Sequence, residues 1–159
     1  MSQIEIIDNY LPDTIFNEMQ ELLLSRGFPW YFQNRIVEHT PTNYQFVHVF
    51  KPDSQYTQLV RPLLNKINPT QVLRCKVNLR PITTQHEQSP YHVDQTRNQN
   101  HKIAIYYINT NNGYTIFEHD KQQIQSIQNR LIIFDGHLRH AGVSTTDTKR
   151  RVVLNLNYI

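Results

Sequence analysis

The sequence predicts a mainly β (α+β) fold: a jelly roll, or double-stranded β-helix, with N-terminal helices packed on one of its two sheets. Two observations predict it. Apolar residues recur at helical spacing in two stretches of the first part of the chain, and from Val72 onward they alternate with polar residues in about seven short strands. Strands and helices do not alternate, so a parallel α/β sheet is not expected. We expect one domain over residues 1–159, with residues 1–70 as helical support and residues 71–159 as the jelly-roll core.

Two helices are expected before the main run of strands. The first begins near Pro12 and Asp13 and ends at Gly27, in the usual C-terminal position for glycine. The second runs over residues 54–67, and Pro62 should kink or interrupt it. The apolar stripe of the first helix consists of Ile15, Phe16, Met19, Leu22 and Leu23.

Short strands separated by polar or turn residues account for most of the remaining chain. They are expected at residues 4–7, 46–50, 72–80, 102–109, 114–118, 124–128, 131–134 and 151–159. The stretch 82–90 is polar and is expected to be a loop. Asn111-Asn112-Gly113 is a hairpin-turn signal between the strands that flank it.

Charge and composition restrict the classes of function. The net charge is +3, and the densest basic run, residues 149–151, is too short for a nucleic-acid-binding tail. Cys75 is the only cysteine, so no intramolecular disulfide can form, and its alternation with Val77 and Leu79 predicts a buried thiol. The N-terminus has no signal-peptide pattern and no apolar run reaches membrane-spanning length. These features predict a soluble, cytoplasmic protein.

A His-x-Asp pair, His92 and Asp94, is the first candidate for chemistry. Side chains two apart on an extended backbone point to the same side, so one imidazole nitrogen and one carboxylate oxygen can reach one metal ion. A second histidine from a distant strand would complete the 2-His-1-carboxylate set of non-haem Fe(II) oxygenases. A hydrophobic strand that ends in a glycine turn brings in either His137 or His140. We prefer His140, because the two small residues after it leave room beside a metal.

The last strand has two different faces. The apolar face should meet the helices and carries Val152, Leu154 and Leu156. The polar face must look into the jelly roll and carries Arg151, Val153, Asn155 and Asn157. An arginine that points inward needs an anionic partner, and a carboxylate can accept two hydrogen bonds from its guanidinium group. The phase of the strand favours Arg151 over Arg150 as that arginine.

These residues stand in an order that resembles the 2-oxoglutarate- and Fe(II)-dependent oxygenases, closest to the prolyl-hydroxylase-like branch. The order is His92-x-Asp94, then His140, then a basic residue on the closing strand. Tyr91-His92-Val93-Asp94, followed by Ile105-Tyr106-Tyr107-Ile108-Asn109, is similar to the same stretch in prolyl hydroxylases. The ending, residues 151–157, is similar to the closing strand of bacterial and phage members. The resemblance covers residues 74–159.

The resemblance implies an enzyme that uses Fe(II), 2-oxoglutarate and O₂ to hydroxylate an unactivated C–H bond, with a peptidyl proline as the leading substrate. It implies three Fe(II) ligands, which are His92, Asp94 and His140. It further implies that Arg151 binds the distal carboxylate of 2-oxoglutarate, and Tyr107 falls where the family often has a second donor to that carboxylate. Asn78 and Lys76, on the polar face of an earlier strand, are expected to line the same pocket.

Two other functions stay open at this point. One is a non-catalytic jelly-roll module that binds an anionic partner through a basic face, with structural histidines and salt-dependent binding. The other is a cupin-type metal enzyme that does not use 2-oxoglutarate. The expected partner is a peptide, a protein or a small molecule. The sequence leaves the oligomeric state undefined.

Overall fold

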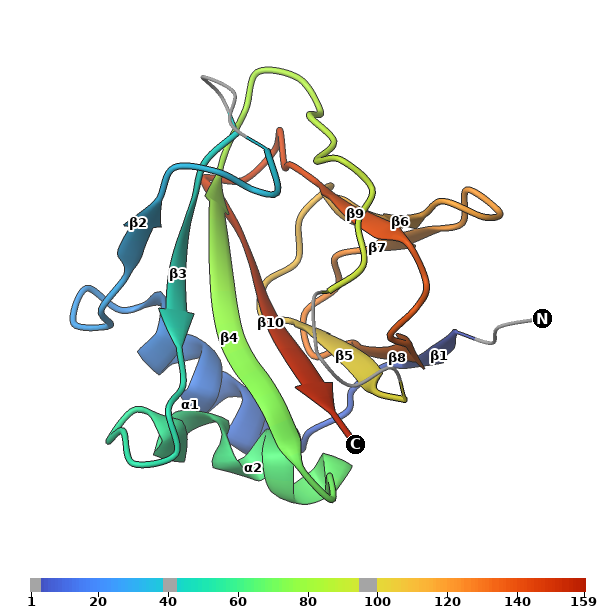
Figure 1. The fold of residues 1–159 in the computed structure, drawn as a ribbon. Helices are drawn as coiled ribbons and strands as arrows, with labels where there is room; N and C mark the ends of the chain where they lie inside the picture. Colours follow the sequence, from blue (N-terminus) through green and yellow to red (C-terminus); the bar gives the residue numbers. More distant parts are fainter. Residues whose placement is uncertain (1–3, 39–42, 95–99) are drawn as a thin grey trace.

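The larger of two antiparallel sheets carries two helices on its outer face, and the smaller sheet lies against its inner face (Figure 1). This computed structural model describes residues 4–38, 43–94 and 100–159. The arrangement confirms the predicted mainly β jelly roll with helices packed on one sheet.

The large sheet has seven strands and the small sheet has three. In spatial order, the large sheet consists of β1 (Glu5–Ile7), β8 (Leu131–Asp135), β5 (Lys102–Tyr107), β10 (Arg150–Tyr158), β4 (Val72–Pro81), β3 (Gln45–Val49) and β2 (Tyr31–Gln33). The small sheet consists of β7 (Gln123–Gln125), β6 (Tyr114–Phe117) and β9 (His140–Val143). The helices are α1 (Asp13–Leu24) and α2 (Thr57–Ile67). The strand β10 therefore lies at the centre of the large sheet, between β4 and β5.

Helix α1 buries a narrower stripe than the sequence predicts. Ile15 and Leu22 stay 38% and 41% exposed, whereas the buried residues are Phe16, Met19 and Leu23. The prediction that Gly27 ends this helix is wrong. Ser25 is the C-cap instead, because its backbone N–H and its hydroxyl both donate to the Leu22 carbonyl, at 3.3 Å and 2.7 Å.

Helix α2 continues through Pro62 and is not interrupted there. Val60 and Leu63, on either side of the proline, are fully buried against the sheet, and this packing outweighs the lost backbone hydrogen bond. The helix ends at Asn68, whose left-handed backbone (φ 53°) lets its N–H donate to the Leu64 carbonyl. In the described part of the chain, neither helix is long and apolar enough to cross a membrane.

The two-faced character predicted for the central strands β4 and β10 is confirmed. The residues that face the helices are Cys75, Val77, Val152, Leu154 and Leu156. The residues that face the space between the sheets are Arg74, Lys76, Asn78, Arg80, Arg151, Val153 and Asn155. Cys75 is 3% exposed, and burial raises the pKa of its thiol to about 12, in agreement with the predicted inert thiol.

The space between the sheets is apolar at one end and polar at the other. The apolar end is filled by a buried cluster of Ile103, Ile105, Tyr107, Phe117, Ile124, Ile132, Phe134, Leu138 and Val153. The polar end lies over β4 and the first half of β10, where charged and amide side chains line a cavity instead of a packed core. The functional residues expected from the sequence lie at this polar end, except Tyr107, which belongs to the apolar cluster.

The hairpin predicted at Asn111-Asn112-Gly113 is wrong. Strand β5 pairs with β8 and β10, whereas β6 pairs with β7 and β9, so this turn carries the chain from one sheet to the other. The glycine is needed for close packing, because a Cβ at Gly113 would lie 2.7 Å from Cδ of Arg151. The turn therefore helps to position an arginine of the cavity.

Candidate functional site

Three side chains that are far apart in the sequence meet at the cavity. The ligand atoms of His92, Asp94 and His140 all lie within 4.8 Å of one another. Nε2 of His92 is 3.7 Å from Oδ1 of Asp94. His137, the alternative to His140, is exposed and does not belong to this group. The structure thus brings together the three residues that the sequence analysis preferred.

Backbone pairing fixes the distance between the two histidines. The His92 N–H donates to the His140 carbonyl and the His140 N–H donates to the His92 carbonyl, both at 3.0 Å. Directly paired residues of an antiparallel ladder carry their side chains on the same face. The two imidazole rings accordingly lie with their centroids 4.9 Å apart. The site is therefore held by a strand pair and does not depend on side-chain contacts alone.

Each histidine ring is also held in one tautomer. Nδ1 of His92 lies 3.0 Å from the Pro90 carbonyl, and Nδ1 of His140 lies 3.0 Å from the Leu138 carbonyl. A carbonyl only accepts, so Nδ1 carries the proton in both rings and Nε2 keeps a free lone pair. Burial lowers the pKa of His140, although Asp94 opposes the shift. In each ring Nε2 is therefore the nitrogen left to bind a metal.

Asp94 is buried, yet it is held as a carboxylate. Burial by itself raises its pKa, but nearby positive charge, that of Arg74 first, outweighs burial and leaves the pKa below its ordinary value. Oδ2 lies 3.0 Å from Nη2 of Arg74, an ion pair that lacks the alignment of a hydrogen bond. The carboxylate keeps unfilled lone pairs in a buried place. Two imidazole nitrogens and one such carboxylate form a donor set that fits Fe(II).

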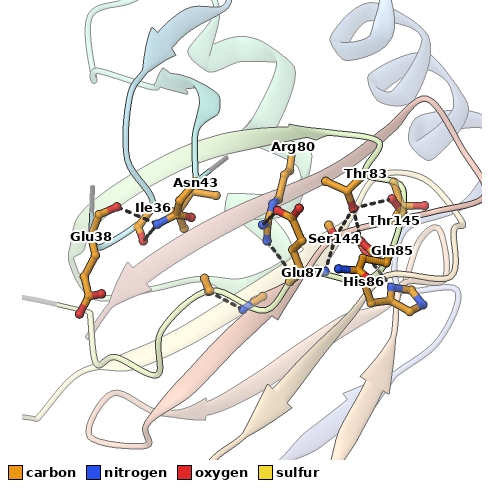
Figure 2. A network of polar contacts seen from close by, with 12 residues as sticks. Ile36, Glu38, Asn43, Arg80, Thr83, Gln85, His86, Glu87, Ser144 and Thr145 are labelled. Atoms are coloured by element: carbon orange, nitrogen blue, oxygen red, sulfur yellow. Dashed lines mark hydrogen bonds and ion pairs between the residues drawn. The ribbon is translucent and has the colours of Figure 1, made fainter. Parts of the chain in front are cut away.

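The segment before His92 is tied to the end of β9 through Ser144 (Figure 2). The Ser144 N–H donates to the Glu87 carbonyl at 3.0 Å, and the Glu87 N–H donates to the Ser144 hydroxyl at 2.8 Å. Thr83 Oγ1 and His86 Nδ1 lie 2.5 Å and 2.8 Å from the hydroxyl and the carbonyl of Ser144. The stretch expected as a loop therefore runs beside β9 as an irregular partner strand, which delivers His92 opposite His140.

Replacing Ser144 by alanine should destabilise the protein by about 1–3 kcal/mol, because the Glu87 N–H loses its acceptor in a buried place. Urea unfolding measures this loss. The control is Thr70→Ala, at an exposed threonine, whose replacement should change the free energy of unfolding by less than about 0.5 kcal/mol. Equal stability of Ser144→Ala and the wild type would show that Ser144 does not hold this segment.

Arg151 points into the cavity, as the phase of the last strand predicts. Its Nε donates to Ser126 Oγ at 3.1 Å and its Nη2 to Thr115 Oγ1 at 3.2 Å. It is 7% exposed, and no carboxylate of the described residues forms an ion pair with it. Burial lowers the pKa of Arg151 to about 10. The guanidinium also lies over the Tyr107 ring, 5.9 Å from its centroid. A buried cation whose hydrogen-bond partners among the described residues are hydroxyls is a site for an anionic ligand.

Arg150 lies on the other face of β10. Its Nη2 donates to the Leu24 carbonyl at the end of α1, at 3.0 Å. It does not line the cavity. The choice between the two arginines, which rested on strand phase, thus agrees with the geometry.

Tyr107 and Asn78 occupy different positions relative to the cavity. The Tyr107 hydroxyl donates to Thr115 Oγ1 at 2.8 Å, and the ring is fully buried outside the cavity lining. Tyr107 therefore lies one hydrogen bond behind the threonine that contacts Arg151. Asn78 and Asn155 line the cavity, and the Oδ1 atom of each is buried without a hydrogen-bond partner among the described residues. Such unsatisfied polar atoms mark a surface that a ligand can complete.

The cavity has a volume of about 500 Å³ and lies between the two sheets. His140 and Gly142 of β9 line one wall, and Arg151 approaches Gly142 closely. Two residues along a strand span about 6–7 Å, so Arg151 lies a short distance along the wall from the histidine. Ile36 and Val37 line another wall, where Asn43 holds their segment by donating to the Glu38 carbonyl at 2.7 Å (Figure 2).

Several residues of the site were missed by the sequence analysis. Thr115 and Ser126, which hold Arg151, belong to different parts of the chain, and nothing local marks them. Arg74 did carry a signal, because it shares the polar face of β4 with Lys76 and Asn78.

The sequence matches no protein-family model and no curated protein. Solved structures are similar to it over almost all of its length. A prolyl hydroxylase from Trichoplax adhaerens, in complex with a hypoxia inducible factor oxygen degradation domain peptide fragment, is 16% identical with a TM-score of 0.74, covering 98% of this chain and 83% of that one. A prolyl-4-hydroxylase from Pseudomonas putida is 14% identical with a TM-score of 0.65, covering 99% and 92%.

The epimerase SnoN, in complex with Fe³⁺, alpha ketoglutarate and nogalamycin RO, is 12% identical with a TM-score of 0.72, covering 99% of this chain and 79% of that one. The chain has the fold of these proteins. This fold is shared by proteins named as hydroxylases and as an epimerase, so it does not define the reaction. The chemistry has to be argued from the residues of the cavity.

Proposed function

We propose that this protein is an Fe(II)- and 2-oxoglutarate-dependent oxygenase that hydroxylates an unactivated C–H bond. One observation carries the proposal: a 2-His-1-carboxylate donor set and a buried arginine without a carboxylate partner line the same cavity. The oxygenase fold and the order of the residues along the chain support it. When bound, Fe(II) with 2-oxoglutarate and O₂ supplies the oxidation of a C–H bond, and 2-oxoglutarate leaves as succinate and CO₂.

In this proposal, His92 and His140 offer Nε2 to Fe(II), and Asp94 offers a carboxylate oxygen. The Pro90 and Leu138 carbonyls keep both rings in the ligand tautomer. Arg74 keeps the carboxylate of Asp94 charged by its ion pair at 3.0 Å. The metal site therefore needs little rearrangement before it binds the ion.

Arg151 binds the distal carboxylate of 2-oxoglutarate. Thr115 and Ser126 fix the plane of its guanidinium group, so its free edge is oriented before the ligand arrives. Tyr107 acts through Thr115, and Asn78 offers its amide to the same ligand. The burial of Arg151 strengthens this ion pair, because water does not screen it.

The experiment that tests the proposal measures succinate by NMR after incubation with Fe(II), O₂ and 2-oxoglutarate. We expect succinate formation that a chelator or N-oxalylglycine stops, and that His92→Ala removes. The matched control is His119→Ala, an exposed histidine paired with Asp120, which should leave turnover unchanged. Turnover that persists in His92→Ala, or that does not depend on Fe(II), would contradict the proposal.

A prolyl peptide is the first substrate to test, since one structure of similar fold is a prolyl hydroxylase with a bound peptide fragment. If the substrate is a peptidyl proline, the peptide gains one oxygen atom by mass spectrometry and raises the rate of succinate formation.

The two alternatives are less well supported. A non-catalytic binding module does not explain why the two imidazole rings are oriented toward a buried Asp94. A cupin-type enzyme that does not use 2-oxoglutarate leaves Arg151 buried without an anion. Binding of N-oxalylglycine that requires both metal and Arg151 separates the proposed function from both alternatives.

A further inference from the structure

Strand β4 presents a row of cations to the cavity. On its polar face, Arg74, Lys76 and Arg80 alternate with buried apolar residues and are interrupted only by Asn78. In the strand register, Arg80 stands opposite Arg151 and Lys76 stands opposite Asn155. Four residues of strand span about 13 Å, so the cations form two groups. One group lies at the Arg151 end, and the other lies beside Asp94.

The group at the Arg151 end is already neutralised in part. Nη1 of Arg80 donates to the Glu87 carbonyl at 2.9 Å, and Nη2 lies 3.4 Å from Oε2 of Glu87 (Figure 2). Arg80 therefore has its own carboxylate, and Arg151 remains for the cosubstrate. No further anion is needed at this end.

The group beside Asp94 has too little negative charge. Asp94 is the only acidic side chain among the described residues that line the cavity, and the sequence of residues 1–3, 39–42 and 95–99 contains no Asp or Glu. The single negative charge of Asp94 lies close to both Arg74 and Lys76. In the proposed function, the same carboxylate also binds the metal. Burial, followed by the repulsion of Arg74, lowers the pKa of Lys76. Arg74 and Lys76 therefore share the carboxylate of Asp94, which is also a proposed metal ligand.

Binding of 2-oxoglutarate does not remove the excess of positive charge beside Asp94. The two charges of Fe(II) and the charge of Arg151 are balanced by Asp94 together with the two carboxylates of 2-oxoglutarate, wherever those carboxylates lie in the cavity. Arg74 and Lys76 then have no counter-charge beyond the Asp94 carboxylate, which Arg74 contacts and which the metal also uses. Unpaired buried charges are costly, and an anion from outside the chain removes that cost.

We infer that the substrate carries an anionic group, a carboxylate or a phosphate, which binds to Lys76 and Arg74 next to the metal site. This inference rests on the proposed oxygenase function and names the chemical class of its substrate. A neutral prolyl peptide leaves both cations unpaired, and a cationic substrate is repelled by them. The anionic group holds the substrate with its reacting carbon near the triad.

The test uses protein saturated with Mn(II) and N-oxalylglycine, so that the metal and Arg151 sites are filled and no turnover occurs. Inorganic phosphate in one arm, and acetate in the other, is titrated at constant ionic strength by calorimetry. We expect saturable binding of at least one of these anions, and the stronger arm identifies the kind of group. In Lys76→Gln the dissociation constant of that anion should rise at least tenfold. Lys51→Gln, a lysine on the surface, should leave it within twofold.

Lys76 is chosen because Arg74 contacts Asp94 directly, and its loss could disturb the metal. Folding of the variant is checked by its N-oxalylglycine affinity, which should equal that of the wild type. The inference is overturned if neither anion binds saturably while N-oxalylglycine does. It is also overturned if Lys76→Gln weakens N-oxalylglycine instead of the second anion. If the wild type does not bind N-oxalylglycine, the proposed function itself fails and this inference fails with it.

Discussion

Replacement of Arg151 by glutamine should lower the affinity for 2-oxoglutarate by at least about 30-fold, because truncating one partner of a buried charge pair costs about 2–5 kcal/mol. Arg151 is buried, and the neighbouring cation Arg80 is already paired with Glu87, so Arg80 does not take over the carboxylate. Calorimetric titration of the Mn(II)-loaded protein with N-oxalylglycine measures the loss.

Arg151 should favour binding of 2-oxoglutarate but lower the free energy of unfolding of the ligand-free protein. Burial lowers the pKa of Arg151 to about 10, and a lowering of this size from the ordinary value of an arginine corresponds to a cost of about 3 kcal/mol for the charged group in the folded protein. The cost is present at every pH below that pKa, because the group is charged there in both the folded and the unfolded chain. Arg151→Met should therefore raise the free energy of unfolding of the ligand-free protein by about 1–3 kcal/mol. Urea unfolding checks this.

Arg150→Gln is the matched control. Arg150 lies one residue away on the opposite face of β10 and donates to the Leu24 carbonyl. We expect its replacement to leave N-oxalylglycine affinity within twofold. If Arg150→Gln loses the ligand while Arg151→Gln keeps it, the assignment of the cosubstrate site is wrong.

Replacement of His140 by alanine should weaken Fe(II) binding by at least about 100-fold, more than the effect of losing a residue that only orients a ligand. The wild type should gain about 2.7 kcal/mol of stability when the metal is present at 100 times its dissociation constant. The variant should gain none under the same conditions. Metal content after dialysis and urea unfolding with and without metal measure the two effects.

His137→Ala is the control for this substitution, since His137 is exposed and lies outside the triad. Because His140 is buried, its loss also removes packing. His92→Ala provides a second variant at a side chain that is 26% exposed. Metal binding that survives in both His140→Ala and His92→Ala, or that disappears in His137→Ala, would refute the proposed ligand set.

Strand phase explains which parts of the site the sequence predicts. A strand of period two assigns each residue to one face, so the alternation in β4 and β10 was sufficient to place Arg151 and Asn78 inside and Cys75 under the helices. The same rule put His92 and Asp94 on one side. These are local properties, and they do not depend on which strand lies beside which.

Properties that depend on strand pairing could not be predicted in the same way. The polar stretch 82–90 has no periodicity, and its partner β9 lies about fifty residues later in the chain. The turn at Asn111-Asn112-Gly113 has the composition of a hairpin, but its glycine serves close packing against Arg151. The position of Tyr107 behind Thr115 likewise depends on where the small sheet lies.

The central position of β10 has a consequence for how the protein is made. This strand joins the group β1-β8-β5 to the group β4-β3-β2, and it is the last of the strands to leave the ribosome. Until it emerges, β4 and β5 expose unpaired edges in the nascent chain, which is the period of greatest risk of aggregation. The same strand carries Arg151 and Asn155 into the cavity. Closure of the large sheet and creation of the binding pocket therefore depend on the same strand.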